Sequence, residues 1–184
     1  MKDTNIRLVT LAVIVLAAAL SRLLPHPFNF TPIGAMALFG GAYFGRKYLA
    51  FLVPLSAMLI SDLLLGFHGS MWAVYGSFIL IVLIGMGLLR KITVGRVLAA
   101  STLSSILFFL ITNFAVWYHA GSMYPQTPAG LLACYVAGLQ FYQQELFGNL
   151  FLNTVMGDLF FTTLLIGGFE WLKSKAPVLE TAKV

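Results

Sequence analysis

The sequence predicts an all-α protein, a polytopic bundle of helices that crosses a membrane. Sixty per cent of its 184 residues are apolar and only 9% are charged, whereas soluble domains carry roughly a quarter charged residues. Several apolar runs are long enough to cross about 30 Å of hydrocarbon. A chain of this length forms one domain, which here covers residues 1–184.

Five apolar runs have the length of a membrane-spanning helix. They cover about residues 6–24, 49–67, 72–89, 97–118 and 148–172. Residues 31–44 form a sixth candidate, although 14 residues make only about 21 Å of helix. This helix must tilt, lie in a thinned region of the bilayer, or be shielded by protein. Residues 128–146 are a weaker seventh candidate, because glutamines and a glutamate interrupt their C-terminal half.

The basic residues favour six spans over seven. With six spans and the N-terminus inside, ten of the eleven Lys and Arg residues lie on the cytoplasmic side, and Arg22 alone lies outside. A span at 128–146 would move Lys173 and Lys175 outside, against the positive-inside rule. We therefore expect six spans with both termini in the cytoplasm. Residues 128–146 then form an outer, partly inserted helix with Thr127 as cap and Pro128 at its first position.

The stretch PHPFNFTPIGAMALFGGAYFG, residues 25–45, brings rigid, polar and very small residues into this apolar chain. Its prolines stiffen a short outer loop and hold His26 and Asn29 at the mouth of the bundle. Thr31-Pro32 has the cap-then-proline form of a helix start. Four small residues then share one helix face, which predicts a groove for close packing of a neighbouring helix. These residues are Gly34, Ala37, Gly41 and Gly45.

Polar and aromatic side chains gather in the outer half of the six predicted spans. The inner half contains only hydroxyls within its spans, such as Ser101 and Ser105. Amides and carboxylates are costly in lipid, so they face the bundle interior or a wet cavity. We therefore predict a polar and aromatic cavity open to the outside. Its candidate substrate-binding residues are Arg22, His26, Asn29, Asp62, Trp72, Tyr75, Phe109, Asn113, Trp117, Asn153 and Asp158.

Three of these candidates are Arg or Asp side chains within or beside the apolar runs. Asp62 is expected to pair with Arg22, either as a structural lock between helices or as a pair that reaches a polar ligand group. Asp158 lies near the middle of its span. It is either a neutral carboxyl that bonds a neighbouring helix or a carboxylate of a proton relay.

Phe109, Asn113 and Trp117 follow one another at helical spacing and form a stripe. An amide between two aromatic faces is a suitable cradle for a planar ligand. The alternative is an asparagine that joins two helices by a hydrogen bond. The sequence leaves both interpretations open.

Catalytic, metal and nucleic-acid functions find little support in the sequence. His26, His68, His119 and Cys134 have no metal-ligand spacing, so we expect no metal and keep these four as weak candidates. Motifs such as GxSxG, HExxH and the Walker sequence are absent. We therefore expect no cofactor and no enzymatic activity, and an intramembrane enzyme is the third hypothesis. The basic residues lie between apolar runs, which excludes a nucleic-acid partner.

The segments SRLLPHPFNFTPIGAMALFGGAYFG, LISDLLLGFH, FFLITNF and GDLFFTTLL resemble an uncharacterised family of small bacterial membrane proteins over nearly the whole chain. Size, topology and the outer-half polar residues also resemble the substrate-binding S components of energy-coupling factor (ECF) vitamin transporters. This resemblance implies a bacterial inner-membrane protein that binds a vitamin- or corrinoid-like molecule in an outer cavity. The implied gating loops are residues 25–30, 67–71 and 119–147.

Uptake of a small molecule across the lipid bilayer is thus the principal hypothesis. S components dock on an energising module through an Ala-xxx-Ala pattern in their first span, and here only Ala17 and Ser21 approximate that pattern. An ECF module as partner and uptake without one both stay open. The alternative function is a structural or assembly protein of the membrane that transports no ligand.

Overall fold

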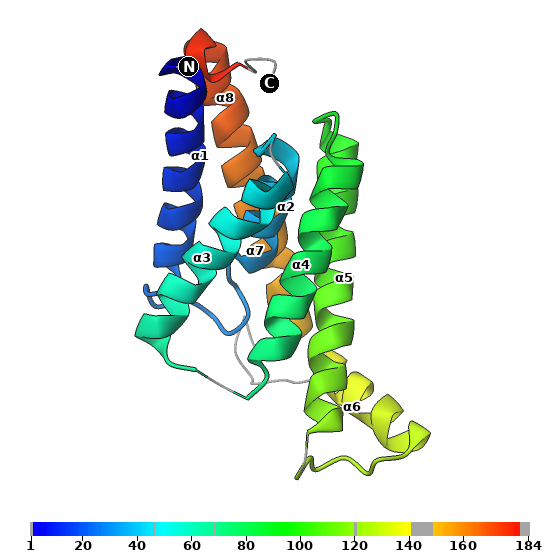
Figure 1. The fold of residues 1–184 in the computed structure, drawn as a ribbon. Coiled ribbons are helices and arrows are strands. Elements are labelled where there is room, and N and C mark those ends of the chain that lie inside the picture. The colour runs from blue at the N-terminus through cyan, green and yellow to red at the C-terminus, as the bar shows by residue number, and fades with distance from the viewer. Residues whose placement is uncertain (1, 46, 68, 120, 141–148, 181–184) are drawn as a thin grey trace.

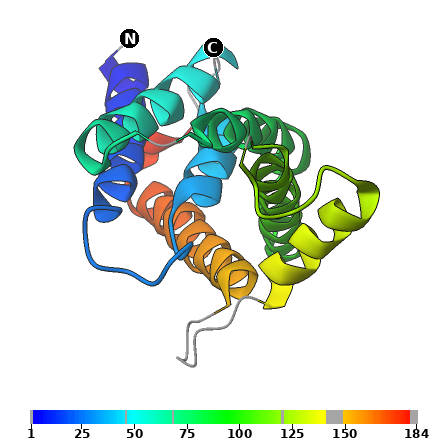
Figure 2. The same cartoon turned by 90° about the horizontal axis from the view of Figure 1, so that it is seen from below.

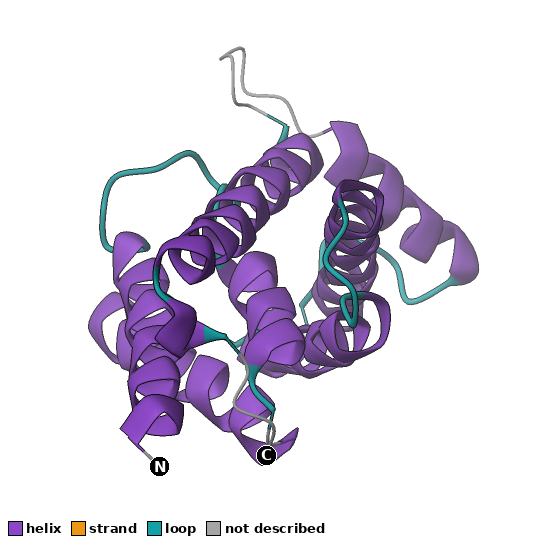
Figure 3. Cartoon of the chain, turned by 90° about the horizontal axis from the view of Figure 1, so that it is seen from above, coloured by secondary structure: helices purple, strands orange, loops and turns teal. Residues whose placement is uncertain are grey.

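The computed structural model describes residues 2–45, 47–67, 69–119, 121–140 and 149–180 (Figure 1). This part of the chain contains helices and loops only, which confirms the all-α prediction (Figure 3). The first six helices are α1 Lys2–Ser21, α2 Ile33–Tyr43, α3 Lys47–Leu65, α4 Met71–Leu88, α5 Val94–Tyr118 and α6 Pro128–Gln140. A seventh, continuous helix comprises α7 Leu150–Thr162, a π-helical turn Thr163–Gly167 and α8 Gly168–Lys175, and a short 3₁₀ turn follows at Pro177–Leu179.

Four helices in the described residues are long and apolar enough to cross a membrane. They are α3, α4, α5 and the continuous helix Leu150–Lys175, with mean hydropathies between 1.6 and 2.1. Shorter apolar helices are Asn5–Ser21, Ile33–Tyr43 and Pro128–Leu139. These features are those of a membrane protein. The N-terminal end of α1 and the C-terminal end of α8 lie at the same end of the bundle (Figure 1).

The short helix α2 lies in the middle of the bundle (Figure 2). Nine of its eleven residues are buried, and it contacts α1, α3, α4, α5 and α7. Its length is only about 16 Å, so its ends would not reach both surfaces of a bilayer. Among the three expectations for the predicted helix 31–44, shielding by protein is therefore the one that the structure confirms.

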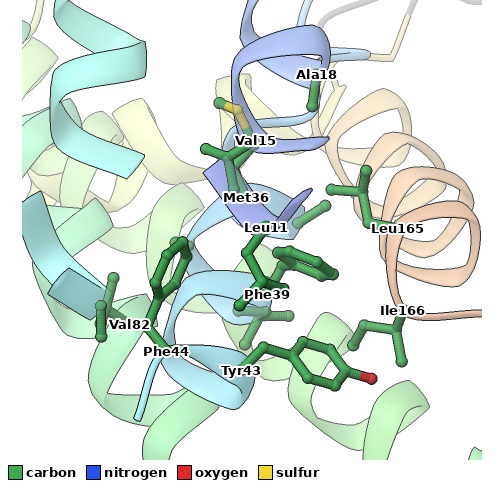
Figure 4. Close-up of a cluster of buried hydrophobic side chains, with 14 of the residues drawn as sticks. Leu11, Val15, Ala18, Met36, Phe39, Tyr43, Phe44, Val82, Leu165 and Ile166 are labelled. Carbon is green, nitrogen blue, oxygen red and sulfur yellow. The ribbon is translucent and has the colours of Figure 1, made fainter. Parts of the chain in front are cut away.

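Side chains of α2 form the centre of the hydrophobic core (Figure 4). Met36 and Phe39 are fully buried. At the C-terminal end of α2, the Tyr43 ring packs edge-on against Phe169 of α8, with centroids 4.6 Å apart. The Tyr43 hydroxyl donates a hydrogen bond of 2.7 Å to Glu170 Oε1. The core thus fixes α2 to the helices on either side of it.

Glycines bring the backbone of α2 very close to its neighbours. A Cβ atom at Gly41 would collide with the carbonyl oxygen of Val82 in α4, and one at Gly85 would lie 2.6 Å from the Leu38 carbonyl oxygen. Gly34 faces Asp158 of α7 instead, while no atom lies within 4 Å of a Cβ at Gly45. The predicted groove against one neighbouring helix is therefore wrong in part. Because α2 is central, the same face meets α7 at one end and α4 at the other.

Two predicted helix starts have different outcomes. Thr127 Oγ1 accepts a hydrogen bond of 3.2 Å from the Gly130 amide, and α6 begins at Pro128, as predicted. The predicted Thr31 cap of α2 is wrong. The N-cap is Pro32, with no side-chain cap bond, because the first helical turn begins one residue later than expected.

Two other predicted boundaries also change. The first span, predicted at 6–24, ends at Ser21, so Arg22 lies in the turn that follows α1 rather than within a span. Residues 141–148 of the predicted outer helix and of the start of the last span lie outside the described residues.

The contact between Gly41 and α4 predicts a clear loss of stability on enlargement. Gly41→Ala should lower the melting temperature of the purified protein, because overpacking against backbone typically costs about 1–3 kcal/mol. Gly87→Ala in α4 is the matched control, since nothing lies within 4 Å of its added methyl group. Equal melting temperatures for the two variants would show that α2 and α4 are not in close contact.

Candidate functional site

The segment that connects α1 to α2 packs against α7. Asn153 Nδ2 of α7 donates a hydrogen bond of 2.9 Å to the Phe28 carbonyl oxygen. A Cβ at Gly157 would lie only 3.1 Å from the Phe30 Cα, so the glycine allows a direct backbone contact. Gly157 is seven residues into α7, or about 10 Å along its axis. Non-helical chain therefore reaches into the bundle before α2 begins.

Arg22 and Asp62 form the predicted ion pair. Arg22 Nη1 lies 2.7 Å from Asp62 Oδ1, and the two side chains are 10% and 5% exposed. The same Nη1 donates to Ser61 Oγ, and the Tyr75 hydroxyl donates to Asp62 Oδ2 at 2.8 Å. Both carboxylate oxygens therefore have a donor, as a buried charge requires. The pair joins the end of α1 to α3 and α4.

A cavity of about 360 Å³ lies between this loop and helices α2, α4, α5 and α7. Such a volume is at the lower end of the range for small-molecule sites, about 300–1,000 Å³. Its polar lining consists of Arg22, Asn29, Thr31, Ser70, Thr112, Asn113, Thr154 and Asp158. Asn29 has a left-handed backbone conformation with φ of 63°, which asparagine adopts more readily than most residues.

Asp158 is a buried carboxyl in the wall of this cavity. It is 3% exposed, and Ser105 Oγ of α5 donates a hydrogen bond of 2.7 Å to its Oδ2. The carboxyl group lies against Gly34, where a side chain of any size would collide with it. Within the described residues, the buried hydroxyls of Ser101 and Thr162 have no hydrogen-bond partner. Ser101 lies four residues before Ser105 in α5, and Thr162 lies four residues after Asp158 in α7, so polar groups continue beyond Asp158 on both helices.

A larger hollow of about 1,160 Å³ lies beside the cavity. The start of α4 and the loop between α5 and α6 form its walls, which include Trp72, Tyr118 and His119. Ser70 and Val116 line both hollows. We call the larger hollow the vestibule. The shared residues place the vestibule directly next to the cavity.

The structure brings several of the predicted site residues together. Arg22, Asn29, Asn113 and Asp158 line the cavity. Asp62 pairs with the Arg22 guanidinium, and Tyr75 donates a hydrogen bond to Asp62. Trp72, which is 55% exposed, lines the vestibule instead.

The predicted stripe of Phe109, Asn113 and Trp117 does not form one cavity wall. Phe109 packs against Phe151 and against Tyr135 of α6, with ring centroids 4.9 and 5.9 Å apart. Trp117 Nε1 donates a hydrogen bond of 2.8 Å to the Pro125 carbonyl oxygen. Only Asn113 reaches the cavity, because α6 and its loop cover this face of α5.

Two further candidates also lie away from the cavity lining. His26 is exposed, and its Nδ1 lies 2.7 Å from the Leu24 carbonyl oxygen within its own loop. Asn153 is buried, and its side-chain amide supports the loop through the Phe28 carbonyl. These residues shape the loop, whereas Thr31, Thr112 and Thr154, which are not among the predicted site residues, line the cavity.

The four weak metal candidates do not come together among the described residues. No group of three or more His, Cys, Asp or Glu side chains in this part of the chain could hold a metal ion. Cys134 is buried in α6, where desolvation raises the pKa of its thiol, and its Sγ lies 3.4 Å from the Asn113 carbonyl oxygen. His119 lines the vestibule, and His68 lies outside the described residues.

Comparison with known proteins gives a family but no function. Residues 2–179 match the model of a family of unknown function, DUF6580. No curated protein and no solved structure matches the chain. The function must therefore be argued from the site itself.

Proposed function

The chain belongs to the DUF6580 family of unknown function, and we propose that it is a substrate-binding membrane protein for the uptake of a small molecule. The observation that carries this proposal is the convergence of polar side chains on one cavity. Arg22, Asn113 and Asp158 come from three distant parts of the chain and line the same 360 Å³. Burying polar groups in an apolar bundle is energetically costly. A hydrated binding site would explain why these polar side chains are present.

The proposed topology has six spans, which are α1, the four longer helices, and a segment in which the non-helical chain before α2 and α2 itself cross the bilayer together within the bundle. The start of α1 and the end of α8 lie at the same end of the bundle (Figure 1), which supports an even number of crossings. A seventh span at α6 would break this rule and would also move Lys173 and Lys175 outside. We place the termini in the cytoplasm of a bacterial cell and the protein in the inner membrane, with an S-component-like arrangement of helices.

In this orientation the cavity would open to the outer side. The loop between α5 and α6, which forms part of the vestibule, lies at the end of the bundle opposite the start of α1 (Figure 1). A ligand would enter the vestibule between Trp72 and Tyr118, and pass Ser70 and Val116 into the cavity. Whether the protein works with an energising ECF module or without one does not change this route.

A structural or assembly role is the second candidate. The pairing of Arg22 with Asp62 favours it, because this pair joins helices without any ligand. Helix joining requires direct contacts, however, and it gives no reason for a hollow lined by threonines, asparagines and a carboxyl group. We therefore prefer uptake, and we propose no catalytic role.

The topology predicts which ends of the protein are accessible from outside the cell. In a Cys134→Ala background, Met123→Cys should react with a membrane-impermeant thiol reagent on whole cells, since Met123 is 86% exposed in the vestibule loop. Ser174→Cys, at the other end, should react only after lysis. The opposite pattern would place the cavity on the cytoplasmic side and would contradict uptake.

The proposed function predicts that a ligand accompanies the protein through gentle purification. Native mass spectrometry should detect the added mass, and the released compound can then be identified and titrated. Asn113→Ala should weaken its binding about tenfold to a hundredfold, the effect of losing a buried hydrogen-bond partner worth about 1–3 kcal/mol. Trp117→Phe is the control on the same helix, and it should leave affinity unchanged because Trp117 does not line the cavity. A ligand-free protein that binds nothing in a metabolite screen would favour the structural role.

A further inference from the structure

The Arg22 guanidinium uses only one of its nitrogens in its described contacts. Nη1 makes the hydrogen bonds to Met58 Sδ, Ser61 Oγ and Asp62 Oδ1. Nε is buried and has no partner among the described residues. The side chain is only 10% exposed and lines the cavity. Few hydrogen bonds from water therefore replace the missing protein partner of Nε. Nε and Nη2 together form a planar pair of donors, which matches a carboxylate.

Asp158, in the wall of the same cavity, is a buried acidic group without an ion-pair partner among the described residues. Its Oδ2 accepts a hydrogen bond from Ser105, and it is 3% exposed. Neither of the ion pairs in the described residues involves Asp158, because Arg22 pairs with Asp62 and Lys173 with Glu170. A cationic partner stabilises a buried carboxylate, and no Lys, Arg or His among the described residues forms an ion pair with Asp158.

We propose, on the basis of the proposed uptake function, that the ligand is a small zwitterion. Its carboxylate binds the Nε and Nη2 edge of Arg22, and its ammonium group binds Asp158. The neutral lining between these two ends, with Thr31, Asn113 and Thr154, supplies hydrogen bonds to the ligand. Arg22 and Asp62 balance each other, and the ammonium group of the ligand balances Asp158. The ligand carboxylate shares the Arg22 guanidinium with Asp62, so each charged end of the ligand faces a group of opposite sign, and the occupied site carries one net negative charge.

The test uses the full-length protein in detergent and measures melting temperature with matched probes. The zwitterions are glycine, β-alanine, 4-aminobutyrate, 5-aminovalerate and 6-aminohexanoate, which cover a range of distances between the two charges. Carboxylates and alkylammonium ions of equal chain length are the controls for each charge alone. We expect at least one zwitterion to raise the melting temperature, and both of its singly charged counterparts to have a much smaller effect at equal concentration. An equal effect of the matched anion or cation would overturn the proposal.

Variants test the role of each charged end. Asp158→Asn keeps the shape of the side chain and its contact with Ser105, so it should fold. It should weaken binding of the effective zwitterion at least about tenfold, and it should remove the preference over the matched carboxylate. Thr162→Val, one helical turn away and outside the cavity lining, should leave binding unchanged. Unchanged zwitterion binding by Asp158→Asn would overturn the assignment of the ammonium group.

The outcome also separates this inference from the proposed function. A co-purified ligand that is neutral or singly charged, and that Asn113→Ala releases, would support uptake and overturn the zwitterion. Binding of none of the probes, together with the absence of any co-purified ligand, would overturn both. A co-purified zwitterion whose affinity falls in Arg22→Lys, which keeps the charge beside Asp62 but loses the planar edge, would support both.

Discussion

The burial of a helix too short to span a bilayer is the constraint on which the rest of the structure depends. With eleven residues, α2 is about 16 Å long, and lipid would leave its terminal backbone groups without partners. The surrounding helices enclose α2 and so separate its ends from lipid. Enclosure on several sides is feasible because small residues allow close approach, as Gly41 does toward α4 and Gly34 toward Asp158.

The position of α2 also explains the cavity. Because α2 begins inside the bundle, the chain that leaves α1 must enter the bundle as non-helical backbone. Such backbone is tolerated at membrane depth only where protein surrounds it or where it lines a wet hollow. Asn153 and Gly157 hold one side of this segment against α7. On the other side, Asn29 and Thr31 face the cavity together with Arg22. The rigid, polar stretch before α2 thus forms part of the cavity wall.

Features that depend on local sequence could be predicted well. The lengths of the apolar runs predicted the positions of the long helices. The partner of Asp62 could be predicted because a buried carboxylate requires a cation and Arg22 is the only one expected on the outer side. Thr154 could have been found as well, since it lies one helical turn from Asp158 on the same face. The Thr154 hydroxyl also donates a hydrogen bond within its own helix, to the Leu150 carbonyl oxygen at 2.9 Å.

Features that depend on which helices meet could not be predicted. On α5, the cavity is lined by the face of Phe108, Thr112 and Val116, one position before the predicted stripe of Phe109, Asn113 and Trp117. Both stripes have helical spacing, and only the packing of α6 decides between them. The packing of Tyr135 on Phe109 shows which one is covered. For the same reason, the glycine face of α2 was assigned one partner although it has two.

The most direct test of this account measures whether water and small polar solutes reach the cavity from outside. In a Cys134→Ala background, Thr154→Cys would place a thiol in the cavity wall, and Leu152→Cys would place one on the same helix at a position that is 51% exposed outside the cavity lining. Only a hydrated thiol forms the reactive thiolate. The account predicts that a small membrane-impermeant methanethiosulfonate labels Thr154→Cys in whole cells and leaves Leu152→Cys unlabelled. An unreactive Thr154→Cys in a folded protein would contradict the outward-facing cavity.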